Sequence, residues 1–353
     1  MAERGRSRAW IVEKFGGPER LTLSGREDPS PGPGEVRLRT AAIGLNFADL
    51  FVRAGAYPNT PPVPMVPGME ISGVIDAVGA GVEALEVGQP AVAVPIFGGH
   101  AESVVCSAER VFPLPDGVDL VEAAALPVAF LTADYALSAG DARAGERLVV
   151  TAAAGGVGSA LLQLARGRGM RTLALVGSDP KLDLCRRLGA ETAGLYDSAE
   201  ALLDAGFERR ADLVVDAIGG RLFRRLWRRL DRGGRYVLYG FAAASRPGGV
   251  AKLRAALELA AMAIVVPYRT IQECRTLIGF NLSLLPGRTG RLRESAREIF
   301  RKWRAGEIAP VLGPRFSFER LPDAHRALAG RGTTGKVVVV VAPDPGAGAD
   351  QAP

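Results

Sequence analysis

A glycine-rich turn between an expected strand and an expected helix carries the clearest chemistry in this sequence. Residues 148–150 are Leu-Val-Val, which is typical of a buried strand, and the apolar side chains of residues 159–165 recur at helical spacing. Between these segments lie Gly155, Gly156 and Val157. Glycines let backbone amides approach a ligand closely, and the positive end of the following helix attracts a pyrophosphate. The pattern therefore predicts a dinucleotide site at these three residues.

The turn departs from the common G-x-G-x-x-G pattern at one place. Ala153 stands where the first glycine is usual, whereas Gly155 and Gly158 hold the other two positions. A turn that only lets a helix pack on its strand is therefore an alternative. From about residue 126 onward, however, expected strands alternate with expected helices, which is typical of a parallel sheet and favours the cofactor site.

The residues that follow the next strand predict which cofactor is used. In folds that select NAD, an acidic side chain at this place accepts a hydrogen bond from the ribose 2′-hydroxyl and repels a 2′-phosphate. Here Gly177 and Ser178 are small and neutral, and Lys181 can reach a phosphate. Asp179 precedes Pro180, a favoured first residue of a helix, so Asp179 or Ser178 is expected to cap that helix. The sequence therefore predicts NADPH rather than NADH.

The composition is that of a globular protein. The 353 residues suffice for about two domains, with 48% hydrophobic and 23% charged side chains. The net charge of +6 is modest, and we interpret it as favouring solubility rather than as a sign of nucleic-acid binding. Cys106, Cys185 and Cys274 are far apart, which argues against disulfides and a cysteine metal site and favours a reducing, cytoplasmic compartment. We find neither a signal peptide nor the roughly 18 apolar residues of a membrane span.

Hydrophobic periodicity and turn residues divide the chain into a β-rich part and an alternating part. Asn46 is placed to cap a short helix in the first part. Residues 66–79 are expected to form a turn followed by alternating strands. The other expected strands are residues 10–12, 21–23, 35–40, 148–150, 171–176, 192–196, 212–216, 235–239, 276–283 and 336–341, and the later helices are residues 180–188, 291–305 and 321–329.

Five short motifs give the chain a family resemblance. They are NFAD at 46–49, GAYP at 55–58, PGME at 67–70, AAGGVG at 153–158 and GKVV at 335–338. In this order they resemble the zinc-independent quinone oxidoreductases of the medium-chain dehydrogenase/reductase superfamily, and residues 240–271 resemble the branch related to vesicle-membrane-associated homologues. The resemblance implies an α/β fold with two domains. A GroES-like β-rich catalytic domain would comprise residues 1–125 and 286–342, a doubly wound Rossmann domain residues 126–285, and a disordered tail residues 343–353.

Because this superfamily also contains zinc-dependent enzymes, we compare their zinc ligands with the residues at the same positions in this sequence. Those relatives carry a cysteine where Asn46 stands and a histidine where Met69 stands, and an amide and a thioether do not replace thiolate and imidazole on Zn²⁺. The four closely spaced cysteines of their structural zinc site are absent from the sequence. We interpret His100 and His325 as isolated surface or structural residues and Glu70 as a structural carboxylate. We expect no metal.

Without zinc, hydride addition to an electron-poor C=C conjugated to a carbonyl is easier than alcohol oxidation. The resemblance implies NADPH-dependent reduction of quinones or α,β-unsaturated carbonyls. Such an enzyme orients the reactants, excludes water and stabilises negative charge on the product oxygen. The family pattern places Tyr57 and Asn46 at the catalytic mouth. The alternatives are a Tyr57 ring that only packs on the cofactor and an Asn46 that only caps a helix.

Further cofactor contacts are implied by the resemblance, although each residue has an alternative role in packing or turns. They are Thr132, Tyr196, Tyr239, Gly240, Phe241, Phe280, Asn281, Leu282 and Lys336.

Two other functions compete with quinone or enone reduction. One is an enoyl-thioester reductase, and the other is an NADPH-binding protein that acts through RNA, a membrane or a partner. The arginines between residues 221 and 232 are interpreted as a solvated helix face. The apolar residues 250–266 are interpreted as a buried lid or dimer helix, too short to span a bilayer. The strand 276–283 predicts a homodimer, because an apolar sheet edge is an aggregation hazard unless it is paired.

Overall fold

The chain divides into two compact units, which are described separately. The computed structural model describes residues 5–208, 210–245, 251–263, 267–285 and 289–341. Unit 1 comprises Met1–Val128 and Arg288–Pro353, and unit 2 comprises Ala129–Gly287. The sequence predicted divisions after residues 125 and 285, and the expected disordered tail lies outside the described residues. The α/β class and the parallel sheet of the second part are confirmed.

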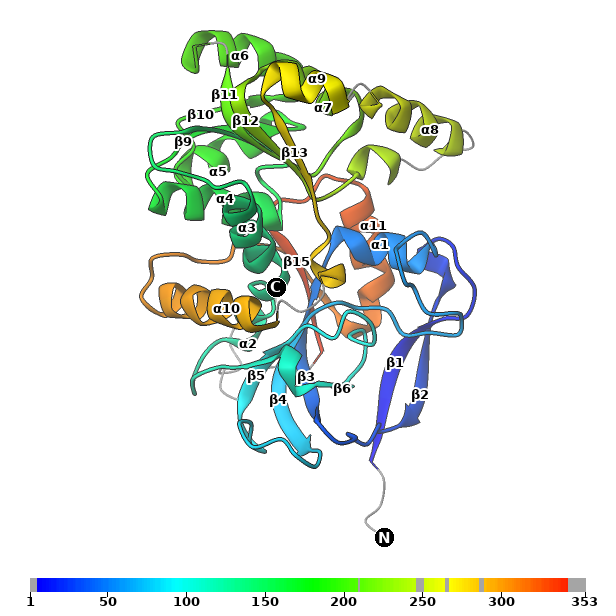
Figure 1. Ribbon diagram of the computed structural model, residues 1–353. Helices are drawn as coiled ribbons and strands as arrows, with labels where there is room; N and C mark the ends of the chain where they lie inside the picture. The colour runs from blue at the N-terminus through cyan, green and yellow to red at the C-terminus, as the bar shows by residue number, and fades with distance from the viewer. Residues whose placement is uncertain (1–4, 209, 246–250, 264–266, 286–288, 342–353) are drawn as a thin grey trace. The chain divides into compact units, whose positions relative to one another are not determined.

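Unit 1 is built around a sheet in which β3 is the central strand (Figure 1). The strand order is β14-β15-β3-β4-β5-β7, β6 also pairs with β3, and β1 and β2 form a separate hairpin. The strands are β1 (Arg6–Val12), β2 (Leu21–Glu27), β3 (Glu35–Leu45), β4 (Ile71–Val78), β5 (Pro90–Ala93), β6 (Ser103–Ser107), β7 (Val111–Pro113), β14 (Leu312–Ser317) and β15 (Lys336–Val340). The helices are α1 (Phe47–Arg53), α2 (Leu120–Ala123), α10 (Thr289–Arg304) and α11 (Leu321–Ala329).

The valine run of β15 is buried on both of its faces. Val338 belongs to a small apolar cluster with Val121 and Ala124 around α2, whereas Val337 and Val339 belong to the main core of unit 1. A strand covered on both faces needs continuous apolar residues rather than alternation. The run of four valines therefore marks an interior strand, and its first residue, Lys336, is the polar exception.

Unit 2 is a six-stranded sheet with the order β10-β9-β8-β11-β12-β13, and every pair in it is parallel. The strands are β8 (Arg147–Thr151), β9 (Arg171–Val176), β10 (Thr192–Leu195), β11 (Ala211–Asp216), β12 (Leu230–Leu238) and β13 (Thr276–Gly279). The helices are α3 (Pro127–Ala139), which begins in unit 1, α4 (Gly156–Gly167), α5 (Leu182–Arg187), α6 (Ala199–Gly206), α7 (Gly220–Arg228), α8 (Ala251–Met262) and α9 (Pro267–Glu273). Strand order reverses beside β8, so its carboxyl end and that of β11 are where such sheets bind ligands.

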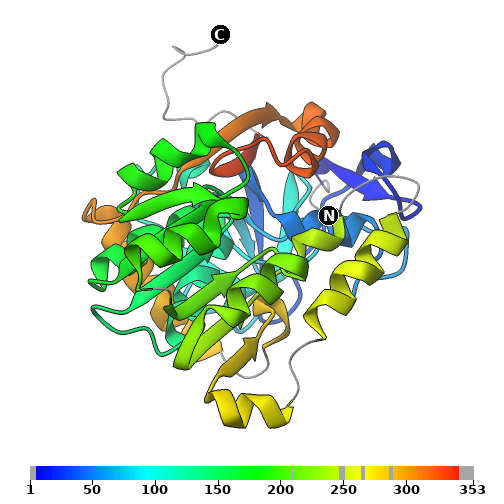
Figure 2. The ribbon, with the colours of Figure 1, turned by 90° about the horizontal axis from the view of Figure 1, so that it is seen from above.

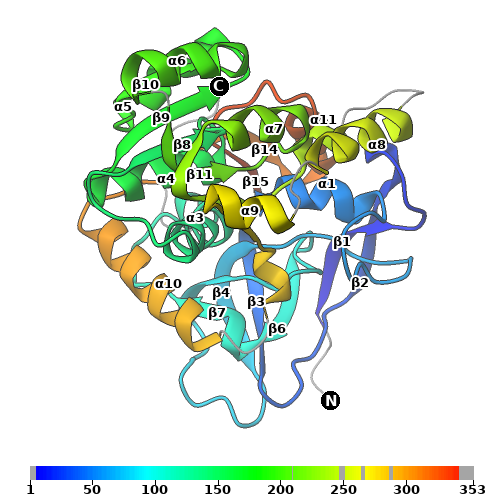
Figure 3. The same ribbon diagram turned by 45° about the horizontal axis from the view of Figure 1, so that its top comes forward.

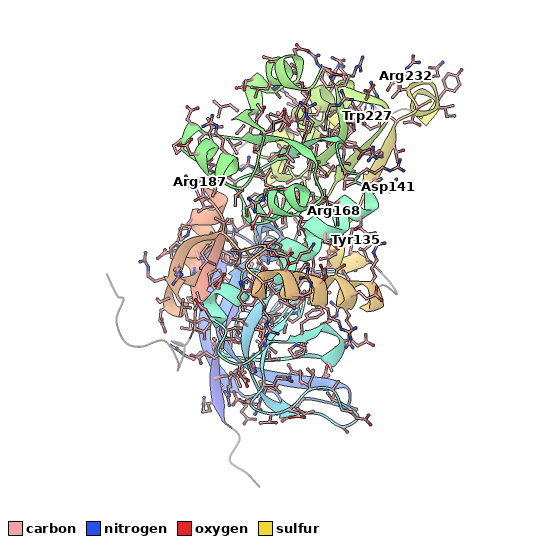
Figure 4. The ribbon with its side chains drawn as sticks, turned by 90° about the vertical axis from the view of Figure 1, so that its left-hand side faces the viewer. Tyr135, Asp141, Arg168, Arg187, Trp227 and Arg232 are labelled. Carbon is pink, nitrogen blue, oxygen red and sulfur yellow. The ribbon has the colours of Figure 1, made fainter. Side chains whose placement is uncertain are left out.

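The apolar face of α7 is buried. Phe223 and Trp227 stack with ring centroids 5.8 Å apart, and both belong to the core of unit 2. On the other side of the helix, Arg225 pairs with Glu200 of α6. The expected arginine stripe is shorter than predicted, because α7 ends at Arg228 and Arg232 lies in β12 (Figure 4).

The described part of the apolar segment 250–266 has exposed leucines, contrary to the interpretation as a buried lid. Its described part forms α8, which lies beside α7 (Figure 3) and leaves Leu253, Leu257 and Leu259 at least half exposed. The contact with α7 is partly polar, since Glu258 Oε2 accepts a hydrogen bond of 2.8 Å from Arg221 N. None of the helices within the described ranges combines the length and the apolar character that a bilayer crossing requires.

The last strand of unit 2 is also shorter than predicted. β13 ends at Gly279, and α9 lies next to it at the outer end of the sheet (Figure 2). Asn281 then accepts hydrogen bonds from Ser283 N (3.1 Å) and Ser283 Oγ (2.8 Å). A side chain that bonds to the backbone two residues on favours a turn over a strand, and here it begins a short 3₁₀ helix, Leu282–Leu284.

His100 and His325 are neither isolated nor on the surface. Both are fully buried in unit 1, and their rings meet edge to face with centroids 5.3 Å apart. Arg53 Nη1 donates to His325 Nδ1 at 3.0 Å, which makes that nitrogen an acceptor. The ring nitrogens of His100 have no hydrogen-bond partner among the described residues. Burial lowers the pKa of His100 to about 3, and it also lowers the pKa of His325.

These histidines predict a loss of stability in mild acid. An unfolded histidine takes up a proton below pH about 6.5, whereas folded His100 stays neutral, so unfolding becomes easier as the pH falls through that value. We expect wild type to lose about 1.4 kcal/mol more of its unfolding free energy between pH 7.5 and 5.5 than His100→Phe. Urea titrations at both pH values measure the difference. Asp49 and the other carboxyl groups with shifted pKa values are present in both proteins, so their contributions cancel in the comparison. Equal losses would contradict the prediction.

Candidate functional site

The turn between β8 and α4 brings the helix very close to its strand. Gly155 stands at the N-cap of α4 in an extended conformation. A Cβ atom on Gly158 would lie 2.2 Å from Ala152 O and 2.6 Å from the Ala153 Cα, so only glycine allows this approach. Ala153 itself is fully buried, so the one departure from the glycine pattern is a packed methyl group. Gly158 therefore serves packing and leaves the preceding residues to face a ligand.

The first amides of α4 are available to an anion. Gly156 and Val157 are the first residues of the helix, whose opening amides have no acceptor within it and lie at its positive end. The loop after β11 differs, because Ala217 N donates to Thr151 Oγ1 at 2.9 Å and Gly219 N donates to Asp216 Oδ2 at 3.0 Å. Of these two loops, the β8–α4 turn is the one suited to a pyrophosphate.

Asp216 is a buried residue of this region that the sequence analysis missed. It is the last residue of β11, and it accepts hydrogen bonds from Thr151 Oγ1 (2.6 Å), Tyr236 Oη (2.8 Å) and Ile218 N (2.8 Å). Burial raises its pKa, while these hydrogen bonds oppose the rise. The carboxylate thus connects β8, β11 and β12 at their ligand-binding ends. The available signal was an acid that directly follows the apolar residues 213–215.

The residues predicted to select the cofactor gather at the end of β9. Gly177 lies beside the ring of Tyr196, since a Cβ atom on Gly177 would be 3.5 Å from Tyr196 Cε2. Ser178 stands at the N-cap of the 3₁₀ helix Asp179–Lys181, but its side chain makes no capping hydrogen bond, contrary to one of the two capping possibilities. Lys181 is half-buried, and burial lowers its pKa. The exposed Asp179 lies at the start of the same short helix.

Aromatic side chains gather where β12 and β13 end. The ring of Phe280 lies 4.6 Å from that of Tyr135 on α3, and 6.2 Å from that of Tyr239, to which it is nearly parallel. Burial raises the pKa of Tyr239 far above its usual value. Thr132 is buried one turn before Tyr135. Arg168 donates to Asp134 at 2.7 Å and so ties the end of α4 to α3, where Tyr135 lies (Figure 4).

The remaining predicted contacts of unit 2 flank this aromatic cluster. Gly240 leaves no room for a side chain, because a Cβ atom there would lie 2.8 Å from Ala217 O, and Phe241 packs beside Gly219. Asn281 and Leu282 form the start of the 3₁₀ helix after β13.

Unit 1 holds a buried polar cluster at Asn46. Lys336 Nζ donates to Asn46 Oδ1 at 2.6 Å and forms an ion pair with Glu70, and Asn46 Nδ2 donates to Glu70 Oε1 at 2.8 Å. The three residues are 5%, 8% and 0% exposed for Lys336, Asn46 and Glu70 respectively. Asp49 accepts a hydrogen bond of 2.8 Å from Asn46 N, and burial raises its pKa to about 7. Sequence analysis found Asn46 and Lys336 separately but not their contact.

Tyr57 lies in the turn after α1, half-buried against the core of unit 1. Its carbonyl oxygen accepts a hydrogen bond of 2.6 Å from Thr60 Oγ1, which fixes the turn that carries the ring. In unit 1, Asn46 and Lys336 are therefore in direct contact, and Tyr57 lies in a separate turn.

The positions of the two missing zinc ligands are filled by other chemistry. Asn46 binds an ammonium group, and Met69 is buried in the apolar core. Within the described part of the chain, no three or more His, Cys, Asp or Glu side chains are grouped so that they could hold a metal ion.

Comparison with known proteins places these features in a family. One family model, described as "Alcohol dehydrogenase GroES-like domain", matches residues 32–116, and another, described as "Zinc-binding dehydrogenase", matches residues 188–339. The synaptic vesicle membrane protein VAT-1 homolog of Rattus norvegicus is 32% identical over 96% of this chain and 85% of its own length.

Solved structures agree with this placement. The quinone oxidoreductase from Thermus thermophilus, whose structures include a complex with NADPH, is 38% identical with a TM-score of 0.79, covering 95% of this chain and all of the other. The Escherichia coli quinone oxidoreductase complexed with NADPH has a TM-score of 0.84 at 25% identity, with the same coverage. This chain belongs to the zinc-independent quinone oxidoreductases and VAT-1 homologues of the medium-chain dehydrogenase/reductase superfamily, a family of oxidoreductases.

Proposed function

We propose that this protein reduces quinones or other α,β-unsaturated carbonyl compounds with NADPH and without a metal. The observation that carries the proposal is the β8–α4 turn, where the first amides of α4 suit a pyrophosphate, whereas the loop amides of Ala217 and Gly219 after β11 donate to Thr151 and Asp216. The NADPH complexes of the Thermus thermophilus and Escherichia coli relatives support the choice of cofactor.

Different groups of residues would bind the different parts of NADPH. Gly155, Gly156 and Val157 would hold the pyrophosphate, and the residues around Lys181 and Tyr196 would hold the 2′-phosphate. The apolar rings of Tyr239 and Phe280, with Thr132, Gly240, Phe241, Asn281 and Leu282 around them, would line the nicotinamide and exclude water. When bound, NADPH supplies the hydride.

The role of Tyr57 follows from the hydrogen bonds that Asn46 already makes. Reduction of a conjugated carbonyl places negative charge on its oxygen, and a hydroxyl donor lowers the energy of that charge. The amide of Asn46 is engaged by Lys336 and Glu70. We therefore assign the donor role to the Tyr57 hydroxyl and a binding role to Asn46.

The acceptor is tested by following NADPH oxidation in stopped flow with quinones, enones and enoyl thioesters. We expect turnover with quinones or enones, and at least about a tenfold lower kcat in Tyr57→Phe, because the oxyanion donor is lost. Tyr268→Phe, which changes an exposed tyrosine of α9, is the matched control. Preference for enoyl thioesters would favour the thioester reductase. NADPH binding without turnover of any acceptor would favour the protein that acts through RNA, a membrane or a partner.

Cofactor choice is tested at Lys181. A charge-assisted hydrogen bond to the 2′-phosphate contributes roughly 1.5 to 3 kcal/mol, or about ten to a hundredfold in affinity. We expect Lys181→Ala to lose most of the preference for NADPH and to keep its kinetics with NADH, while Lys14→Ala, at an exposed lysine, changes neither. Steady-state kcat/KM values with both cofactors give the ratio. An unchanged ratio in Lys181→Ala, or no preference in wild type, would show that Asp179 or other residues decide.

We also propose that the protein is a homodimer joined along β13. This strand ends the sheet of unit 2, and its Leu277 is 41% exposed. A charge on such an edge opposes pairing with another copy. We expect light scattering at micromolar concentration to give the mass of two chains for wild type and of one chain for Leu277→Lys. Val87→Lys, at an exposed residue of unit 1, should stay dimeric. A monomeric wild type would disprove the proposal.

A further inference from the structure

The side-chain amide of Asn46 is held from two sides by opposite charges. Its oxygen accepts from the Lys336 ammonium at 2.6 Å, and its nitrogen donates to Glu70 Oε1 at 2.8 Å. An ammonium can only donate and an ionised carboxylate can only accept. A flipped amide would place its NH₂ group against the ammonium and its oxygen against the carboxylate. One orientation of Asn46 is therefore allowed.

Three adjacent strands bring these residues together. Asn46 follows β3, Glu70 precedes β4, and Lys336 begins β15, while β3 pairs with both β4 and β15. Gly44 leaves room for the carboxylate, because a Cβ atom there would lie 2.6 Å from Glu70 Oε1 and 2.3 Å from Ala124 O. The sheet register thus fixes which three side chains meet.

The position of the Glu70 carboxylate is fixed by a second contact, which does not involve Lys336. Its second carboxylate oxygen, Oε2, accepts a hydrogen bond of 2.8 Å from Val128 N. Glu70 is fully buried, and burial of charges is costly unless they are paired and hydrogen-bonded. Apolar residues of similar volume often replace a buried ion pair without loss of stability, so a role for this ion pair other than stability is worth testing.

We propose that Lys336 is a positioning residue that acts through Asn46. Its ammonium, held by Glu70, fixes the orientation in which the Asn46 amide meets the cofactor. The inference rests on the proposed function, because that function gives Asn46 its binding role. It gives Lys336, which the resemblance implied as a cofactor contact, a role through its hydrogen bond to Asn46.

A double-mutant cycle on NADPH affinity tests this role, since two residues that act through one contact give non-additive effects. We expect Lys336→Met and Asn46→Ala each to weaken NADPH binding about tenfold, the loss that one hydrogen bond accounts for. The double variant should bind no more weakly than Asn46→Ala alone. Fluorescence titration measures the affinity without an acceptor, and thermal unfolding of each variant verifies folding. Lys14→Met is the matched control at an exposed lysine.

A second pair of variants separates positioning from folding. Lys336→Met leaves Glu70 buried without its counter-charge and can destabilise unit 1, whereas Lys336→Met combined with Glu70→Gln removes both charges. We expect this neutral pair to unfold near the wild-type temperature and still to bind NADPH about tenfold more weakly. Lys336→Arg, which keeps a cation, should recover part of the affinity.

The outcomes distinguish this inference from the function on which it rests. Additive losses in the cycle, or wild-type affinity in the neutral pair, would overturn the role of Lys336 and leave the proposed function standing. NADPH binding that follows the cycle without turnover of any acceptor would overturn the proposed reaction alone. A wild type that does not bind NADPH would overturn both.

Discussion

The close contact between α4 and β8 is the constraint on which the candidate cofactor site depends. With Gly158 against the carbonyl oxygen of Ala152, α4 starts at the carboxyl end of β8, and the first amides of the helix lie at that end of the sheet. A side chain at this position would displace the helix and the amides with it. The other groups of unit 2 follow from the same sheet, since β9, β12 and β13 end at the same edge as β8.

The buried carboxylates of Asp216 and Glu70 have different kinds of partners, and the sequence analysis predicted the partners of neither. Asp216 accepts hydrogen bonds from neutral hydroxyl and amide donors that belong to β8, β12 and the loop after β11. Glu70 instead has Lys336 as its counter-ion and shares Asn46 with it. The first arrangement stabilises a loop, and the second gives a single amide one orientation.

Features formed by consecutive residues could be predicted from the sequence. Contacts between residues far apart in the sequence could not. The turn at Gly155 could be predicted because its strand, glycines and helix are consecutive, and the strand 171–176 matches β9 for the same reason. Lys336 and Asn46 are 290 positions apart, and only the register of β15 on β3 brings them together. His100 and His325 appeared isolated for the same reason. The exposure of α8 was missed because hydrophobicity predicts burial without naming the partner that provides it.

The division of the chain has a consequence for synthesis on the ribosome. Unit 2 is continuous from Ala129 to Gly287, so all of its strands are available once that segment has emerged. The sheet of unit 1 instead needs β15, whose Val338 pairs with Gly44 of β3, and therefore cannot be completed until β15 has emerged, after all of unit 2. β3 is thus translated before unit 2 but gains its last partner strand after it, and until then a chaperone or a neighbouring nascent chain can pair with this edge of β3.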